Sequence, residues 1–272
     1  MEQIKLAGIG LVLGITTVIP GLSVGTMAVA LNVYDRLIGV ITPNIKKIIA
    51  AWKFWLPLVI GGIAGIIFFS KVLTVLFENY PVPANWFFIG VIAGSVPVIY
   101  NRVRQPSSAL PSLSSVICFI LAFAVMILMV IFRPAERTEV YTVLTPHLFG
   151  LLAFGGVLAA LAMIIPGISG TFLLLVIGLY RTLLQAVSDL NFFMLIPVAL
   201  GASIGLLGGA AIVRFLLSKA PRETYGAVLG LVAGSIIVLY PHGFGDGTVI
   251  IFSVAALVAG FAVSFIFGRQ KN

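Results

Sequence analysis

The sequence predicts an all-α polytopic membrane protein made of two inverted repeats, each a re-entrant Pro-Gly hairpin followed by three transmembrane helices. Composition is the first observation behind this class: 61% of the 272 residues are hydrophobic and 9% are charged, whereas soluble chains carry roughly 25% charged residues. Second, the apolar residues form runs of about twenty, the length that a helix needs to cross a ~30 Å hydrocarbon core. Third, the chain contains the same pattern twice. We therefore expect a single membrane domain, 1–272.

Charge and cysteine content exclude several other classes. The formal net charge is +8, but no basic residues cluster with aromatics on a polar segment. We therefore expect no nucleic-acid partner and attribute the excess to the positive-inside rule. Cys118 is the only cysteine and lies in an apolar run, which leaves no disulfide framework or cysteine metal site. His147 and His242 are too few and too far apart to indicate a metal, so neither a metal nor a cofactor is expected.

The duplication is visible as matching segments at a constant offset. Residues 19–34, IPGLSVGTMAVALNVY, match residues 165–180, IPGISGTFLLLVIGLY, at an offset of 146. After a connecting loop that is six residues shorter in the second copy, the offset becomes 140. The residues then in register are Pro57 and Pro197, Gly61 and Gly201, Gly65 and Gly205, Gly90 and Gly230, and Tyr100 and Tyr240. Chance does not produce such a register, so we expect repeat one at 6–132 and repeat two at 147–268.

Each repeat begins with an interrupted apolar segment, at about 6–34 and 147–180. A Pro-Gly pair near the middle ends one helix and turns the backbone. This leaves two halves of roughly 12–15 residues, each too short to cross alone. Three plain spans follow in each repeat, expected at 54–77, 85–100 and 112–132, and again at 192–217, 224–240 and 248–268.

Either broken helices that cross once or re-entrant hairpins that return to their own side fit the interrupted segments, and the charge distribution decides between them. With hairpins, eleven loop Lys and Arg residues fall on one side and three on the other. With broken helices the division is seven against seven, which leaves the orientation unspecified. Hairpins whose two arms both cross the membrane would give the same charge bias, but each half of the interrupted segments is expected to be too short to cross. We therefore expect hairpins and cytoplasmic termini, and an odd number of crossings per repeat inverts the second copy.

The two interruptions predict a ligand site. Irregular backbone at membrane depth must meet protein or water, and in transporters with inverted repeats the interruptions form the substrate site near the midplane. A serine follows each Pro-Gly pair, so we expect it to cap a helix start. Paired helix N-termini favour an anion such as a phosphate or carboxylate. The residues expected to admit and bind it are Ser23, Gly25, Thr26, Ser169, Gly170 and Thr171. The alternative is that the small residues only allow close helix packing.

Four basic residues are candidates for guiding an anionic headgroup. Lys71 and Arg214 lie near the outer and inner ends of predicted spans, and Arg36 and Arg181 close the two hairpins just after tyrosines. For each of them, ordinary anchoring at the membrane interface is the competing interpretation. Acidic residues are confined to loops and helix ends, so a proton relay through a buried carboxylate is not expected.

At the two turns the sequence resembles the bacterial and archaeal polyprenyl-phosphate transporters, long catalogued as a domain of unknown function. The family pattern is close to IPGVSGGTMA in the first repeat and IPGISGSFLLLLLG-Tyr in the second. Here the first reads IPGLSVGTMAVAL, with Val24 in place of a glycine, and the second reads IPGISGTFLLLVIGLY. The resemblance covers nearly the whole chain. It implies a flippase of the plasma membrane that returns undecaprenyl phosphate, or a related polyprenyl phosphate, from the outer to the cytoplasmic leaflet for recycling in envelope synthesis.

Coupling to protons is expected from the charge of such a substrate. A phosphate monoester carries about −1.5 to −2 charge at pH 7, and moving each unit charge inward against an inside-negative potential costs ~2.3 kcal/mol per 100 mV. We therefore expect protons to accompany the lipid, with His147 or His242 as outer relays. The competing function is a small-anion channel or exporter that uses the same helix termini. An enzyme such as an intramembrane phosphatase is not expected, because the predicted spans contain no carboxylate or histidine for catalysis.

Overall fold

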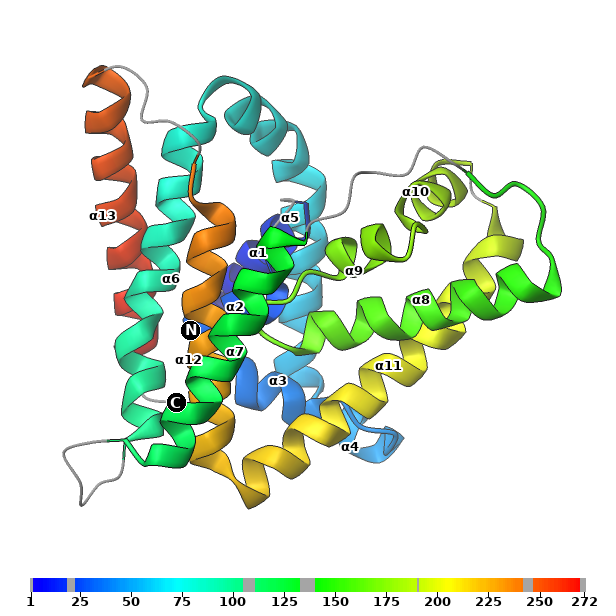
Figure 1. Ribbon diagram of the computed structural model, residues 1–272, viewed down its shortest axis with the longest axis horizontal. Coiled ribbons are helices and arrows are strands. Elements are labelled where there is room, and N and C mark those ends of the chain that lie inside the picture. The colour runs from blue at the N-terminus through cyan, green and yellow to red at the C-terminus, as the bar shows by residue number, and fades with distance from the viewer. Residues whose placement is uncertain are drawn as a thin grey trace.

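The chain folds into helices joined by turns and loops in the computed structural model (Figure 1). The structure describes residues 2–18, 23–104, 111–132, 140–189, 191–241 and 247–269, apart from the side chains of residues 18, 68–75, 77–78, 188 and 267–269. Within these ranges thirteen segments are α-helical and none is a strand. The prediction of an all-α chain is therefore confirmed.

The helices of the described ranges form two similar series. The first is α1 (Glu2–Val18), α2 (Val24–Ala30), α3 (Tyr34–Val40), α4 (Ile45–Ala50), α5 (Trp52–Asn79), α6 (Pro81–Val103) and α7 (Leu113–Ile131). The second is α8 (Pro146–Ile164), α9 (Gly170–Val176), α10 (Tyr180–Ser188), α11 (Phe192–Lys219), α12 (Pro221–Leu239) and α13 (Gly247–Arg269). Helix α9 starts 146 residues after α2, and α11 starts 140 residues after α5, with 28 residues in each of the latter two. The helices therefore follow the offsets of the sequence.

Six helices of the described chain are long and apolar enough to cross a membrane: α6, α7, α8, α11, α12 and α13. Helix α5 adds a shorter apolar stretch, Trp52–Ile67. Helix α9 passes the same test together with residues Tyr180–Val187 of α10, but the two are bent by 118° at the break between them. An all-helical chain with this many apolar helices is a multi-pass membrane protein.

The interrupted segments are divided less evenly than predicted. Helices α1 and α8 have 17 and 19 residues, whereas α2 and α9 have 7 each. The expectation that neither half is long enough to cross was wrong for α8. This helix starts within one residue of the predicted segment, where Pro146 suits a first turn and the Thr145 hydroxyl accepts a hydrogen bond from the Leu148 N–H at 3.1 Å. It is long because the Pro-Gly pair at 166–167 lies past the middle of that segment. Helices α2 and α9 end early, shortly before Asn32 and Gly178, which have φ of 56° and 76°.

The second span of each repeat begins a few residues earlier than predicted. Helix α6 begins at Pro81 and α12 at Pro221, because proline fits the first turn of a helix, where no hydrogen bond is lost. As a result α6 has 23 residues and α12 has 19.

Glycines bring the long helices into close contact in pairs. Helix α1 packs along α5, and α8 packs along α11, at equivalent places in the two series. A Cβ on Gly61 would lie 2.0 Å from the Ala7 carbonyl oxygen, and one on Gly201 would lie 1.8 Å from that of Ala153. Two further pairs join the series to each other, because α6 packs against α13 and α12 against α7 (Figure 1). Gly61 and Gly201 therefore allow close packing of these helices.

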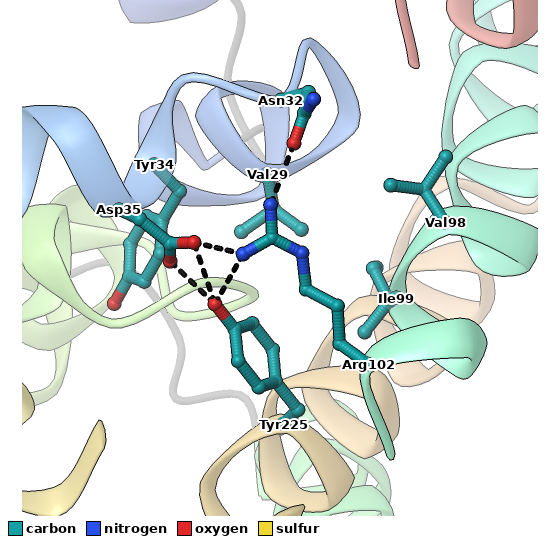
Figure 2. A pocket seen from close by; sticks show the side chains of 8 residues that line it. All are labelled: Val29, Asn32, Tyr34, Asp35, Val98, Ile99, Arg102 and Tyr225. Atoms are coloured by element: carbon teal, nitrogen blue, oxygen red, sulfur yellow. Dashed lines mark hydrogen bonds and ion pairs between the residues drawn. The ribbon is translucent and has the colours of Figure 1, made fainter. Parts of the chain in front are cut away.

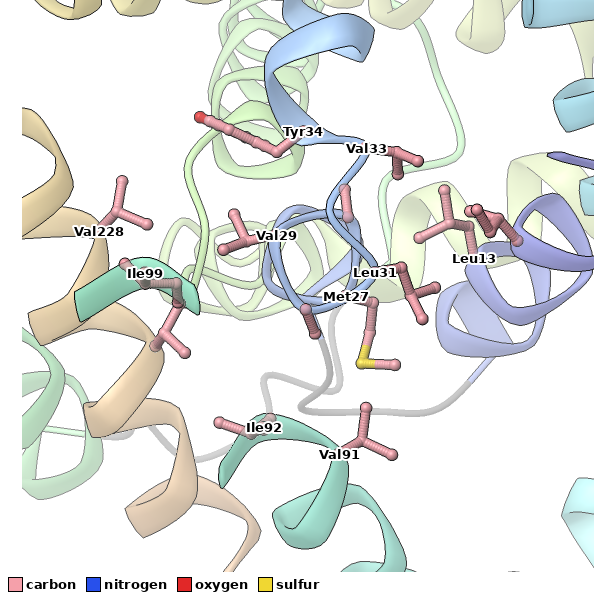
Figure 3. Close-up of a cluster of buried hydrophobic side chains, with 14 of the residues drawn as sticks. Leu13, Met27, Val29, Leu31, Val33, Tyr34, Val91, Ile92, Ile99 and Val228 are labelled. Carbon is pink, nitrogen blue, oxygen red and sulfur yellow. The ribbon is translucent and has the colours of Figure 1, made fainter. Parts of the chain in front are cut away.

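The short helix α2 lies in the main hydrophobic core (Figure 3). Met27 and Val29 of α2 belong to the same cluster as Leu13 of α1, Ile92 of α6 and Val228 of α12. A helix of two turns is not stable by itself in water, so the position of α2 depends on these neighbours. The core thus holds the start of α2 in a defined place.

Candidate functional site

The two interruptions meet where α2 begins and where α8 turns into α9. The Gly167 N–H donates a buried hydrogen bond of 2.6 Å to the Thr26 hydroxyl oxygen. A Cβ on Gly25 would lie 3.1 Å from the Met163 carbonyl oxygen and from the backbone of Pro166. Gly167 has a φ of 88°, a conformation that favours glycine. Residues from both halves of the chain therefore form this junction.

Ser23 begins α2 as predicted, but its hydroxyl does not cap the helix. The backbone is extended, with φ −100° and ψ 127°, as an N-cap requires, yet the side chain makes no capping bond. The side chain is 4% exposed, and its Oγ has no hydrogen-bond partner among the described residues. Pro20 and Gly21, just before it, lie outside those residues. A buried unpaired hydroxyl costs about 1–3 kcal/mol, which a ligand with a suitable oxygen would recover.

The second turn presents its hydroxyls more openly. Ser169 has the same extended backbone, with φ −96° and ψ 125°, and begins α9. Its Oγ lies 2.7 Å from the Thr171 hydroxyl oxygen instead of capping the helix, and Thr171 is exposed. Both predicted helix starts are confirmed, whereas the predicted side-chain caps were wrong. In the second turn the reason is the competing bond to Thr171.

The glycines of both turns are held against α8. A Cβ on Gly170 would lie 2.9 Å from the Ala159 carbonyl oxygen, and Gly25 has a similar backbone neighbour in Met163. The space beside each glycine is thus filled by α8. The structure favours close packing, the alternative to admitting a ligand, as the role of these two residues.

Two of the basic residues singled out in the sequence bind groups outside the junction. Arg214, half-buried in α11, donates to the carbonyl oxygens of Ile38, at 2.8 Å, and Ile41. These oxygens lie at the end of α3, where a cation is favourable. Arg36 is exposed, and its Nη1 donates to the Glu2 carboxylate at 2.7 Å. The guanidinium lowers the pKa of that carboxyl below its usual range.

The remaining predicted residues lie at the surface or outside the described part. Arg181 is exposed in the first turn of α10, and His147 is exposed in the first turn of α8. The side chain of Lys71 and the whole of His242 are outside the described residues. Among the residues that are described, no three His, Cys, Asp or Glu side chains gather as a metal would require.

Tyr34 has a role that the sequence did not predict. In the repeat pattern Tyr34 matches Tyr180 and stands two residues before Arg36, and an interface anchor was one interpretation. The structure shows instead that its side chain is buried, with 4% exposure, and its hydroxyl donates to the Ile164 carbonyl oxygen at 2.9 Å. This carbonyl lies at the end of α8, where backbone oxygens lack helical partners. Tyr34 thus ties α3 to the turn of the other half.

A polar cluster beside α3 was also missed (Figure 2). Arg102, Asp35 and Tyr225 bond to one another, and Arg102 also bonds to Asn32. Asp35 and Tyr225 are 190 residues apart in the chain, so no local pattern brings them together. The one available signal was an aspartate directly after Tyr34, in the first turn of a helix.

Comparison with known proteins identifies the family. The model of the undecaprenyl phosphate translocase-like family matches residues 13–250. A polyprenyl-phosphate transporter of Staphylococcus aureus (strain NCTC 8325 / PS 47) is 29% identical over 281 residues, which covers 99% of this chain and 98% of that protein. A polyprenyl-phosphate transporter of Vibrio cholerae serotype O1 (strain ATCC 39315 / El Tor Inaba N16961) is 29% identical over 246 residues, or 85% of this chain and 76% of that protein. No solved structure matches. The resemblance seen at the two turns is therefore confirmed, and the chain belongs to the undecaprenyl phosphate translocase-like family.

Proposed function

We propose that this chain transports undecaprenyl phosphate, or a related polyprenyl phosphate, from the outer to the cytoplasmic leaflet of the plasma membrane, so that the carrier lipid is used again. The observation that carries the proposal is the buried Ser23 hydroxyl. It has no partner among the described residues and lies one helical turn from Thr26, where the two interruptions meet. Family membership supports the substrate class, because both relatives are named polyprenyl-phosphate transporters.

Hydroxyl groups, rather than helix dipoles, hold the phosphate in this proposal. Helices α2 and α9 have only 7 residues each, so each aligns few peptide dipoles. Ser23 donates its free O–H to a phosphate oxygen, and Ser169 and Thr171 offer two further hydroxyls on the other turn. Hydrogen bonds to a charged group contribute about 1.5–3 kcal/mol each. Thr26 keeps the turns together through Gly167, and the glycines allow their close approach.

The basic residues have supporting roles in this proposal. Arg36 and Arg181 end the two hairpins on opposite faces of the membrane, and each attracts the anionic headgroup on its own side. Arg214 stabilises the end of α3 through the bonds described above. Lys71 is a guide for the headgroup near the outer end of its span.

The proposed topology is a single membrane domain, 1–272, of two inverted repeats, 6–132 and 147–268, with re-entrant hairpins and cytoplasmic termini. Support comes from the repeated helix series and the reciprocal pairs α6 with α13 and α12 with α7. The charge bias of eleven against three sets the orientation.

Cysteine labelling tests this topology. In a chain with Cys118 replaced by Ala, single cysteines at the exposed positions Lys46 and Val143 are treated in intact cells with an impermeant thiol reagent. We expect labelling at 143 and none at 46. The reverse pattern, or labelling at both positions, contradicts the proposed topology.

Protons accompany the lipid in the proposed cycle. The phosphate itself is the proposed carrier, because its second pKa is near 6 and no acidic side chain forms part of the described junction. His147, exposed at the start of α8, and His242 are proposed relays on the outer side.

Reconstitution tests the transport function. Polyprenyl phosphate is placed in one leaflet of proteoliposomes, and the fraction accessible to an impermeant phosphatase is followed over time. We expect the wild type to move the lipid, Ser23→Ala to move it more slowly, and Ser203→Ala to match the wild type. Ser203 is an exposed serine whose hydroxyl bonds to the Ala199 carbonyl of its own helix at 2.8 Å, so it is a matched control. A small-anion channel, the competing function, would conduct inorganic phosphate and leave the lipid in place.

A further inference from the structure

Four polar side chains from separate elements gather around a small cavity (Figure 2). Asn32 lies between α2 and α3, Asp35 in the first turn of α3, Arg102 in the last turn of α6, and Tyr225 near the start of α12. The cavity has a volume of about 20 Å³ and is otherwise lined by Val29, Tyr34, Val98 and Ile99. Space for a water-sized group therefore adjoins a charged pair.

The Asp35 carboxylate accepts hydrogen bonds from two donors that other helices hold in place. Arg102 Nη1 donates to one carboxylate oxygen, and the Tyr225 hydroxyl lies 2.6 Å from both. Arg102 is held in turn by Asn32, whose Oδ1 accepts from Nη2 at 2.9 Å, and its guanidinium carbon lies 5.2 Å from the centre of the Tyr225 ring. Both donors to the carboxylate belong to helices other than its own. An oriented guanidinium with a hydroxyl beside it is a typical site for a small oxyanion.

The pair is open to exchange with an anion from solution. The Arg102 and Asp35 side chains are 38% and 40% exposed, and ion pairs with such exposure contribute little to stability. A phosphate monoester carries about −1.5 to −2 charge and three acceptor oxygens, whereas a carboxylate carries one charge and two oxygens. A phosphate group is therefore able to take both donors away from Asp35.

We propose that Arg102 and Tyr225 form a second binding site for a phosphate monoester, and that Asp35 is its displaceable internal occupant. The inference rests on the proposed function, in which this end of the helices is cytoplasmic and the headgroup leaves there. A competing carboxylate favours release, because Asp35 returns to Arg102 as the phosphate departs. At the offset of 146, the position equivalent to Asp35 is Arg181, so the second half has no such occupant.

Helix α3 connects this second site to the junction of the interruptions. Tyr34, directly before Asp35, donates to the Ile164 carbonyl oxygen, two residues before Pro166. The first turn of α3 therefore contacts the turn of the other half on one side and the Arg102 site on the other. The junction and the Arg102 site are therefore joined through one turn of one short helix.

Equilibrium binding to the purified full-length chain tests the second site, with undecaprenyl phosphate and inorganic phosphate as separate probes. Removal of the competitor in Asp35→Asn is expected to tighten phosphate binding about tenfold. Arg102→Gln is expected to weaken it, and the double variant Asp35→Asn with Arg102→Gln is expected to lose the gain. Asp189→Asn, which removes an exposed carboxylate at the end of α10, is the matched control for charge and is expected to leave binding unchanged.

The outcomes separate this site from the function on which it rests. If Asp35→Asn binds only the lipid probe more tightly, the site is specific for the lipid headgroup. If Asp35→Asn also binds inorganic phosphate more tightly, and the double variant loses this gain, the site binds the phosphate group from either source. If Asp35→Asn binds neither probe more tightly and only lowers the Tm, the cluster is a structural contact and the inference is wrong. If Asp35→Asn binds phosphate more tightly through Arg102 while the wild type moves no lipid in proteoliposomes, the site stands and the proposed function falls.

Discussion

Replacing Ser23 by Ala should separate ligand binding from folding. In the ligand-free protein the Ser23 hydroxyl is buried and has no partner among the described residues, so its removal takes away a polar group that costs about 1–3 kcal/mol to bury. We therefore expect the Tm of the ligand-free variant to equal or exceed that of the wild type. A bound phosphate, by contrast, loses one hydrogen bond to a charged group, worth about 1.5–3 kcal/mol. That difference weakens binding roughly ten- to hundredfold.

The assay is thermal unfolding of the purified protein with and without undecaprenyl phosphate. A ligand that binds only the folded state raises the Tm by mass action, so at one lipid concentration the rise should shrink in Ser23→Ala and stay unchanged in Ser203→Ala. A Ser23→Ala variant that melts earlier without ligand, yet shows the full rise with it, would refute the reasoning. Ser23 would then have a structural partner within the chain.

Three further predictions follow from the junction, the helix pairs and the charge of the substrate. Thr26→Val keeps the side-chain volume but leaves the buried Gly167 N–H without its acceptor, so we expect it to lose about 1–3 kcal/mol of stability. Thermal melts measure this loss, and Thr26→Ser, which keeps the hydroxyl, should not show it. Gly201→Ala places a Cβ 1.8 Å from a carbonyl oxygen and should cost about 1–3 kcal/mol. Gly208→Ala, whose Cβ would have no neighbour within 4 Å, should melt no earlier than the wild type. An imposed pH or voltage gradient should change the rate of lipid movement in oriented proteoliposomes, and a rate indifferent to both would mean passive equilibration.

Local patterns predicted the helices and the position of the junction well, because both depend on short-range chemistry. Runs of apolar residues require spanning helices, and a Pro-Gly pair followed by a serine marks a helix start, as Ser23 and Ser169 show. The boundaries were less accurate. Helix α8 is longer than predicted because Pro166 and Gly167 lie past the middle of the interrupted segment. The early end of α2 depends on Asn32, whose backbone is in the left-handed region. Asparagine tolerates this conformation, but an asparagine in a sequence does not predict it.

The side-chain partners were not predictable, because they depend on tertiary contacts. Tyr34 reaches Ile164, 130 residues away, and Arg102 reaches Tyr225, 123 residues away. A single sequence shows a basic residue at a helix end without showing what it binds. Arg214 was therefore a candidate either for guiding the headgroup or for anchoring at the interface, whereas it bonds to carbonyl oxygens at the end of α3. The capping role of the serines was expected from their position alone, and the structure shows that position and hydrogen bonding are separate properties.

The most direct test of the transport function is the amount of polyprenyl phosphate exposed on the outer surface of cells that lack this chain. An impermeant reagent that recognises the lipid phosphate measures that amount in intact cells. We expect it to rise on depletion of the protein, to return to normal with the wild-type chain or Ser203→Ala, and to remain high with Ser23→Ala. An exposed amount that does not change on depletion would contradict the proposal that this chain carries the lipid inward.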